Sequence, residues 1–121
     1  ATNFDVIVKN SYIGGVIAPG LQLSLENLTK KASLIPSIKF NKSNNIISKN
    51  TKSAINAGFY FGYVGLIDNI INSIIKQVGL TFKVVLTGGL ASTFKNSFKF
   101  KAHIKKNLTI NGVLKTAKQI R

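Results

Sequence analysis

Apolar and polar residues alternate near the start of the chain in a way that is typical of β-strands. Phe4, Val6 and Val8 are apolar at every second position, which predicts a strand over residues 4–8 with one apolar face. The Lys-Asn-Ser run at residues 9–11 has turn chemistry, and we expect it to lead into a second strand over residues 12–17.

The apolar spacing becomes helical after Pro19-Gly20, which breaks the extended pattern. Leu21, Leu25 and Leu28 predict a helix over residues 21–32, and Pro36 follows shortly beyond its expected end. We then expect a short strand around Ile38 and a polar surface loop over residues 39–49. This part of the chain therefore supplies one helix and one long connection.

A long helix is predicted over residues 51–78. Gly58, Gly62 and Gly65 interrupt it, each at a cost of about 1 kcal/mol of helix propensity relative to alanine. These glycines indicate either tight packing within the chain or close approach of a second copy. A membrane span is disfavoured, because Asp68 would lie in hydrocarbon. The apolar positions that keep largely to one face are Ile55, Phe59, Leu66, Ile70, Ile74 and Val78.

The remaining pattern predicts a strand over residues 82–86, a strand over residues 98–104 and a final helix over residues 108–119. Strands and helices thus alternate along the chain, which favours the α/β class in one domain spanning residues 1–121.

Composition narrows the possible chemistry. The absence of cysteine excludes disulfides and thiol nucleophiles, and a single histidine, His103, excludes a multi-histidine metal site. The net charge of +14 can indicate an anionic partner, but the abundant Lys, Asn, Ile and Phe are what AT-rich codons produce, and drift in an AT-rich genome explains the charge more simply. No segment is typical of a signal peptide, and we expect a cytoplasmic protein.

Two places offer candidate binding chemistry. The sequence TGGLA (87–91) follows a predicted strand, where open α/β sheets bind ligands and glycine allows close approach of the backbone, although an ordinary tight turn fits equally well. Asn50 and Thr51 open the long helix, whose free amides and hydroxyl suit an anionic or polar ligand, although a simple N-cap explains them too.

Three segments in this order resemble the C-terminal half of type III pantothenate kinases: GGVIAPGLQLS (14–24), NTKSAINAGFYFGYVGLIDNI (50–70) and TGGLA (87–91). These kinases belong to the actin-like ATPase and sugar kinase superfamily. The resemblance implies a ribonuclease H-like domain with a mixed sheet flanked by helices. It also implies ATP-dependent phosphorylation of pantothenate to 4′-phosphopantothenate, the first step of coenzyme A biosynthesis.

The resemblance assigns roles to particular residues. Gly88, Gly89 and Ala91 match the loop that binds the adenosine of ATP. Thr51, with Asn50 beside it, matches a threonine that contacts pantothenate held mainly by the other subunit of a homodimer. The glycine-bearing helix is expected to contribute to that dimer.

The sequence also departs from the family pattern. Ser48 and Ser53 stand where glycine and glutamate are usual, and Asp68 matches a family aspartate that we expect to be structural. The chain begins at the alanine of the family's D-x-G-T-A-x-T-F-D sequence, and Asn3 replaces a threonine. The catalytic aspartate, the phosphate loops and the ligands of the expected monovalent and divalent cations would lie upstream.

We therefore expect no catalytic residue in this chain, and we expect the chain alone to be inactive. It would represent a fragment, one half of a split protein or the product of a decayed gene. It would also lack the first strand of its domain, which lies centrally in the superfamily's sheet between the hairpin that starts at Phe4 and the strand that starts at Phe82. An N-terminal half would then be a further partner.

Two other functions remain open. Phe94, Phe98 and Phe100 alternate with lysines, which suits a platform for single-stranded nucleic acid, although a half-buried strand explains the pattern more simply. The glycine-bearing helix alone would also allow a non-catalytic dimerisation module.

Overall fold

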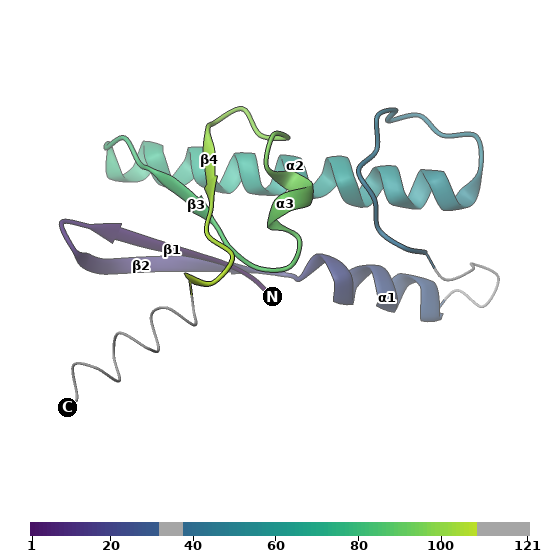
Figure 1. Cartoon of the computed structure of the whole chain (residues 1–121), viewed down its shortest axis with the longest axis horizontal. Coiled ribbons are helices and arrows are strands. Elements are labelled where there is room, and N and C mark those ends of the chain that lie inside the picture. The colour runs from purple at the N-terminus through teal and green to yellow at the C-terminus, as the bar shows by residue number, and fades with distance from the viewer. Residues whose placement is uncertain (32–37, 109–121) are drawn as a thin grey trace. The chain divides into compact units, whose positions relative to one another are not determined.

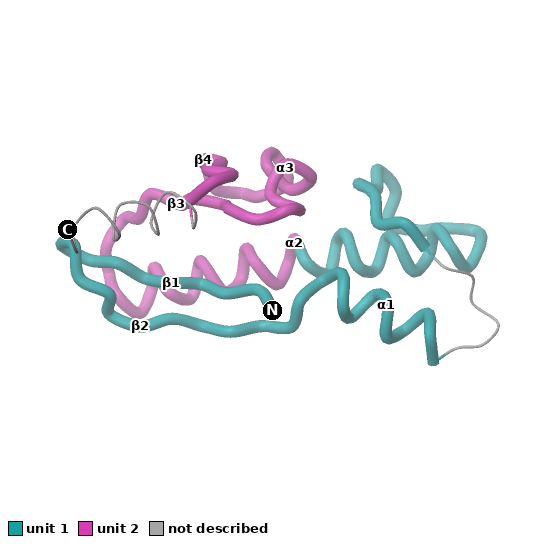
Figure 2. The backbone as a smooth tube through the Cα atoms, turned by 60° about the horizontal axis from the view of Figure 1, so that its bottom comes forward, with its two compact units in different colours: residues 1–63 teal, residues 64–121 magenta. Residues whose placement is uncertain are grey.

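The computed structural model describes residues 1–31 and 38–108 of the chain. It divides into two compact units, residues 1–63 (unit 1) and residues 64–121 (unit 2), which Figure 2 shows in different colours. Figure 1 shows the elements in chain order: β1 (Thr2–Val8), β2 (Ser11–Ala18), α1 (Leu21–Lys31), α2 (Thr51–Val78), β3 (Val84–Leu86), α3 (Ala91–Phe94) and β4 (Ala102–Ile104).

Strands β1 and β2 form an antiparallel hairpin, which confirms the predicted strand–turn–strand start. Lys9 and Asn10 connect them with φ angles of 51° and 64°. Positive φ at both residues is the geometry of type I′ turns, whose twist matches that of the strands they join. The register shifts at Val6, which pairs with Gly14, while the next residue of β1 pairs with Tyr12. The extra residue in β2 makes a β-bulge.

Helix α1 begins directly after Pro19-Gly20, as the breaker pattern predicts. The carbonyl of Gly20 accepts the first helical hydrogen bond, from the N–H of Ser24 at 3.1 Å. Leu21 and Leu25 are buried as expected, whereas Leu28 remains 43% exposed. Ala32 and Pro36, which mark the predicted end of this helix, lie outside the described residues.

The strand expected around Ile38 is wrong. Ile38 is buried, but residues 38–50 form an irregular loop. The reason lies at Asn41, whose N–H donates to Oδ1 of Asn56 at 3.0 Å and whose carbonyl accepts from Nδ2 of Asn56 at 2.8 Å. A helix side chain thus satisfies the backbone groups that a neighbouring strand would otherwise bond.

Helix α2 has the predicted bounds. At its C-terminus Gly79 adopts φ 76°, and its N–H donates to the carbonyl of Ile75 at 2.8 Å, which is the usual αL cap. The predicted apolar face is only half-buried, however. The positions that α2 buries are Ala57, Tyr60, Tyr63 and Ile67.

The tyrosines explain that difference. Tyr63 buries its ring while its hydroxyl donates to the carbonyl of Pro19 at 2.9 Å, so a polar-tipped residue occupies the core. The same carbonyl accepts from the hydroxyl of Thr2 at 3.1 Å. These bonds tie together the start of β1, the connection between β2 and α1, and α2. The buried apolar residues of unit 1 are Ala18, Leu21, Leu25, Ile38, Ala57, Tyr60 and Tyr63.

In unit 2, β3 and β4 form a parallel pair in which Val84 lies opposite Ala102. Both strands are shorter than predicted. Residues 98–100 form a bend instead of a strand, because the N–H of Lys99 donates to Oδ1 of Asp68 at 3.2 Å. That bond removes the amide from any strand ladder. Of the predicted final helix, only Leu108 belongs to the described residues.

The expected α/β class is confirmed, but the strands do not form a single sheet. Among residues 1–31 and 38–108 they form two separate sheets of two strands each, one antiparallel and one parallel. The short α3 stands between β3 and β4 along the chain. In the part of the chain that the structure describes, no helix has both the length and the apolar character that crossing a bilayer requires.

Candidate functional site

The first candidate site is the N-terminus of α2. Oδ1 of Asn50 accepts the N–H of Ser53 at 2.9 Å, and the Asn50 carbonyl accepts the N–H of Ala54 at 3.0 Å. Asn50 is therefore the N-cap, and its side-chain oxygen is already used. Thr51, the first helical residue, is exposed, and within the described residues its hydroxyl has no hydrogen-bond partner. Of the two predicted residues, only Thr51 keeps a free side-chain oxygen.

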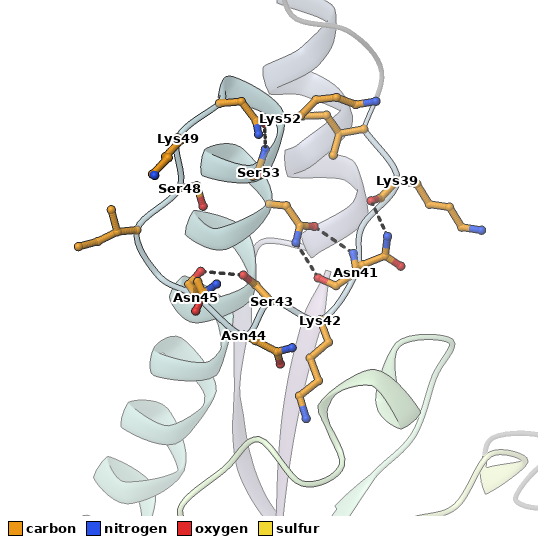
Figure 3. Close-up of a pocket in the computed structure, with 14 residues that line it drawn as sticks. Lys39, Asn41, Lys42, Ser43, Asn44, Asn45, Ser48, Lys49, Lys52 and Ser53 are labelled. Carbon is orange, nitrogen blue, oxygen red and sulfur yellow. Dashed lines mark hydrogen bonds between the residues drawn. The ribbon is translucent and has the colours of Figure 1, made fainter.

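A hollow of about 820 Å³ lies beside this helix start, between the loop of residues 38–50 and the first turns of α2 (Figure 3). Four of its lining residues are lysines, and none carries a carboxylate. Its lining residues are Ile38, Lys39, Asn41, Lys42, Ser43, Asn44, Asn45, Ile47, Ser48, Lys49, Asn50, Lys52, Ser53 and Asn56. We call this feature the lysine-rimmed hollow.

The lysine-rimmed hollow was missed from the sequence. Residues 39–49 were predicted only as a polar surface loop, because the pattern shows no partner for them. The charge pattern could have indicated a positively charged site, since residues 39–53 contain lysines but no aspartate or glutamate. What the sequence could not show is that Asn56 reaches back to Asn41 and holds the loop against the helix.

The second candidate site is the glycine loop after β3. Gly88 adopts φ 103°, a conformation that disfavours a side chain, and among the described residues, apart from the immediate chain neighbours, no atom lies within 4 Å of a Cβ built at Gly88 or Gly89. The backbone is therefore open to a ligand at these two positions. Ala91 is different, because its methyl group is buried and its N–H donates to the carbonyl of Gly88 at 3.3 Å. The structure gives Ala91 a packing role.

The two predicted binding regions belong to different units. Asn50 and Thr51 lie in unit 1, and the loop from Gly88 to Ala91 lies in unit 2. Each region is therefore a separate candidate.

Asp68 has a structural role, as expected. Its Oδ1 accepts the N–H of Lys99 at 3.2 Å and so holds the bend of residues 98–100 on α2 within unit 2. His103 lies half-buried in β4, opposite Val85. Among residues 1–31 and 38–108 no three His, Asp or Glu side chains gather closely enough to hold a metal ion.

The aromatic residues of unit 2 stack on one another. The ring centroids of Phe94 and Phe98 are 6.0 Å apart, and those of Phe98 and Phe100 are 4.9 Å apart with the rings inclined by only 5°. Phe94 is only 5% exposed. Ring faces that contact each other are not available to stack bases, so the geometry does not favour a nucleic-acid platform here.

The glycines of α2 make no close contact. A Cβ built at Gly58, Gly62 or Gly65 meets no atom within 4 Å among the described residues beyond the helix's own backbone. The described residues therefore give no support to tight packing within the chain, one of the two explanations of these glycines.

Comparison with known proteins gives a consistent result. The family model described as type III pantothenate kinase matches residues 1–73. A curated type III pantothenate kinase from Pelagibacter ubique (strain HTCC1062) is 52% identical over the whole chain, which covers 49% of that protein. Another, from Anaeromyxobacter sp. (strain Fw109-5), is 38% identical over 93% of the chain and is covered to 45%. The chain spans about half the length of the curated relatives it matches.

A solved structure from Campylobacter jejuni, described as a conserved protein of the Baf family, is also similar. It is 27% identical with a TM-score of 0.53, and the match covers 97% of this chain and 52% of that one. Both kinds of comparison thus match nearly the whole chain to about half of a longer protein.

Proposed function

The chain belongs to the type III pantothenate kinase family, and on that basis we propose that it is the C-terminal half of an enzyme that phosphorylates pantothenate with ATP. The observation that carries the proposal is the family match over residues 1–73, together with 52% identity across the whole chain to a curated member. The reaction transfers the γ-phosphoryl group of ATP to the primary hydroxyl of pantothenate. We expect it to take place in the cytoplasm.

We propose a division of labour within that enzyme. Phosphoryl transfer depends on positioning and on stabilising charge, for which the catalytic aspartate, the phosphate loops and the bound cations would come from the other half. In this chain, Gly88 and Gly89 leave the backbone open and would let the adenosine of ATP approach it. Thr51 would offer its hydroxyl to pantothenate. This half would therefore contribute binding and orientation.

We also propose a ribonuclease H-like sheet for the complete protein. The described residues contain two separate two-stranded sheets, and the hairpin of β1 and β2 as well as the pair of β3 and β4 each have edges to offer. A strand from outside this chain that pairs with one of these edges would satisfy edge groups whose burial without partners costs about 1–3 kcal/mol each. The open edges support this arrangement.

Thr51 provides the test of the proposed activity. In the full-length enzyme, Thr51→Ala is expected to raise the KM for pantothenate by about tenfold, as loss of a hydrogen bond to a charged or polar ligand does. The KM for ATP should change by less than about twofold. Helix α2 should stay folded, because Asn50 rather than Thr51 provides its N-cap. Steady-state kinetics of pantothenate phosphorylation measures both constants.

Thr51→Ser is the matched control, since it keeps the hydroxyl and should restore the pantothenate KM. An unchanged pantothenate KM in Thr51→Ala would refute the role of Thr51. A wild-type protein that transfers no phosphoryl group to pantothenate would refute the proposed function itself.

We further propose that the enzyme is a homodimer in which α2 contributes to the interface. The open space at Gly58, Gly62 and Gly65 supports this, because it leaves room for another backbone. Gly62→Leu is expected to stabilise the helix by about 1 kcal/mol through propensity alone. The same change should weaken dimerisation by at least about tenfold, because a leucine side chain keeps the second helix away.

Sedimentation equilibrium of the full-length protein measures the dimer dissociation constant, and thermal unfolding measures stability. Gln77→Leu adds the same side chain at another exposed position of α2 and should leave the dimer intact. A monomeric wild type, or a Gly62→Leu dimer of unchanged affinity, would contradict the proposal.

A further inference from the structure

The lysine-rimmed hollow has an unbalanced charge. Lys39, Lys42, Lys49 and Lys52 contribute to its lining, and no lining residue is acidic. Within the described residues none of these lysines forms an ion pair. The charges of these lysines therefore add up to a local positive potential that no acidic side chain of the lining reduces.

The wall of this hollow is held in place by specific contacts. The paired hydrogen bonds between Asn41 and Asn56, at 3.0 and 2.8 Å, fasten the loop to α2. The hydroxyl of Ser43 donates to the carbonyl of Asn45 at 2.9 Å and closes a turn in the loop (Figure 3). The ring of Phe40 lies against that of Tyr60, with centroids 6.4 Å apart. These contacts hold the loop that forms the wall of the hollow against α2.

The start of α2 adds to the same potential. Asn50 caps the N–H of Ser53, which leaves the N–H groups of Thr51 and Lys52 without helical partners. Helix N-termini carry a partial positive charge and favour anions. The lysines and the helix start thus act in the same direction on a ligand in the hollow.

We propose that the lysine-rimmed hollow binds a small phosphate-bearing anion that carries at least two negative charges. Lysine ammonium groups bind phosphate as point charges, and several of them suit a multiply charged ligand better than a single carboxylate. The volume of about 820 Å³ is within the range of small-molecule pockets. No aromatic side chain lines the hollow, so it recognises phosphate groups rather than a nucleobase. This site is additional to the proposed kinase chemistry and does not depend on it.

Pyrophosphate is the probe for the first test. Isothermal titration of the full-length protein at constant ionic strength, with the nucleotide site first saturated by a non-hydrolysable ATP analogue, should show saturable binding of one pyrophosphate per chain. The double variant Lys49→Gln/Lys52→Gln should weaken that binding by at least about tenfold. Lys95→Gln/Lys99→Gln removes the same charge from unit 2, outside the hollow, and should change the affinity by less than about twofold.

Ser53→Glu is a second variant, which separates a loss of binding from a loss of folding. Glutamate is favoured at the third helical position, so α2 should keep or gain stability. The new carboxylate would repel the anion, and pyrophosphate affinity should fall by at least about tenfold. Wild-type protein that does not saturate at about 10 mM pyrophosphate would overturn the proposal. Equal losses in the two lysine double variants, or unchanged binding in Ser53→Glu, would overturn it as well.

Two competition experiments identify the occupant. Pantothenate should not displace pyrophosphate, and displacement would mean that the hollow is the carboxylate pocket of the substrate, which overturns a separate site. A single-stranded oligonucleotide should not bind there more tightly than pyrophosphate if the proposal holds. Tighter binding of the oligonucleotide that is lost in Ser53→Glu would overturn the small anion as the occupant and would identify a nucleic-acid backbone instead. These binding measurements do not require kinase activity, so they test the anion site even if the protein does not phosphorylate pantothenate.

Discussion

Replacing Leu25 with alanine is expected to lower the free energy of unfolding by about 2–5 kcal/mol. Leu25 is the most completely buried large side chain of the described chain, with 1% of its surface exposed. It lies on α1 in unit 1, whose other buried residues include Leu21, Ala57 and Tyr60. Truncation removes its burial and leaves a cavity that the surrounding side chains fill only in part.

Leu23→Ala is the matched control, because Leu23 lies on the same helix and is 61% exposed. The same substitution there should lower the free energy of unfolding by less than about 1 kcal/mol, because the side chain of Leu23 buries little apolar surface. Urea unfolding of both variants, followed by circular dichroism, measures the difference. Equal losses in the two variants would show that the buried position of Leu25 does not stabilise this unit.

Replacing Gly89 with valine is expected to weaken ATP binding to the full-length enzyme by about a hundredfold, which corresponds to about 2.8 kcal/mol. In the described part of the chain, apart from its immediate neighbours, no atom lies within 4 Å of a Cβ built at Gly89, so the surrounding residues leave room for a side chain there. The new methyl groups would fill the space through which the nucleotide reaches the backbone. Stability should therefore change little while nucleotide affinity falls.

Thr81→Val is the control, since it places the same β-branched side chain at an exposed position before β3. Titration with a non-hydrolysable ATP analogue measures affinity, and thermal unfolding measures stability. An analogue that binds Gly89→Val as tightly as wild type would remove the glycine loop from the nucleotide site. Equal affinity losses in Thr81→Val would point to a general disturbance of unit 2.

The elements that were predicted well are those whose causes are local. The hairpin follows from alternating residues on either side of a turn at Lys9-Asn10, and α2 follows from its N-cap at Asn50 and its C-terminal Gly79. Caps and turns act through neighbouring residues and do not depend on distant contacts. These bounds could therefore be read from the chain with little error.

The candidate site residues differ in how accessible the structure leaves them. The glycine loop and Thr51 came from a family resemblance, and the structure shows both as accessible. Asn50 turned out to cap α2, and Ala91 turned out to be buried. A residue that matches a binding motif can equally serve the helix that carries the motif, and local pattern does not distinguish the two uses.

The sequence by itself determined the α/β class, the family and the bounds of the longest helix, because alternation, capping and ordered motifs are properties of neighbouring residues. Tertiary structure alone decided which face of α2 is buried, since Tyr63 enters the core through its bond to Pro19. It also decided that residues 98–100 bend toward Asp68 and that Asn56 shapes the lysine-rimmed hollow. Each of these outcomes depends on a partner at least fifteen positions away, as the separation of 15 residues between Asn41 and Asn56 illustrates. Local periodicity carries no information about such partners.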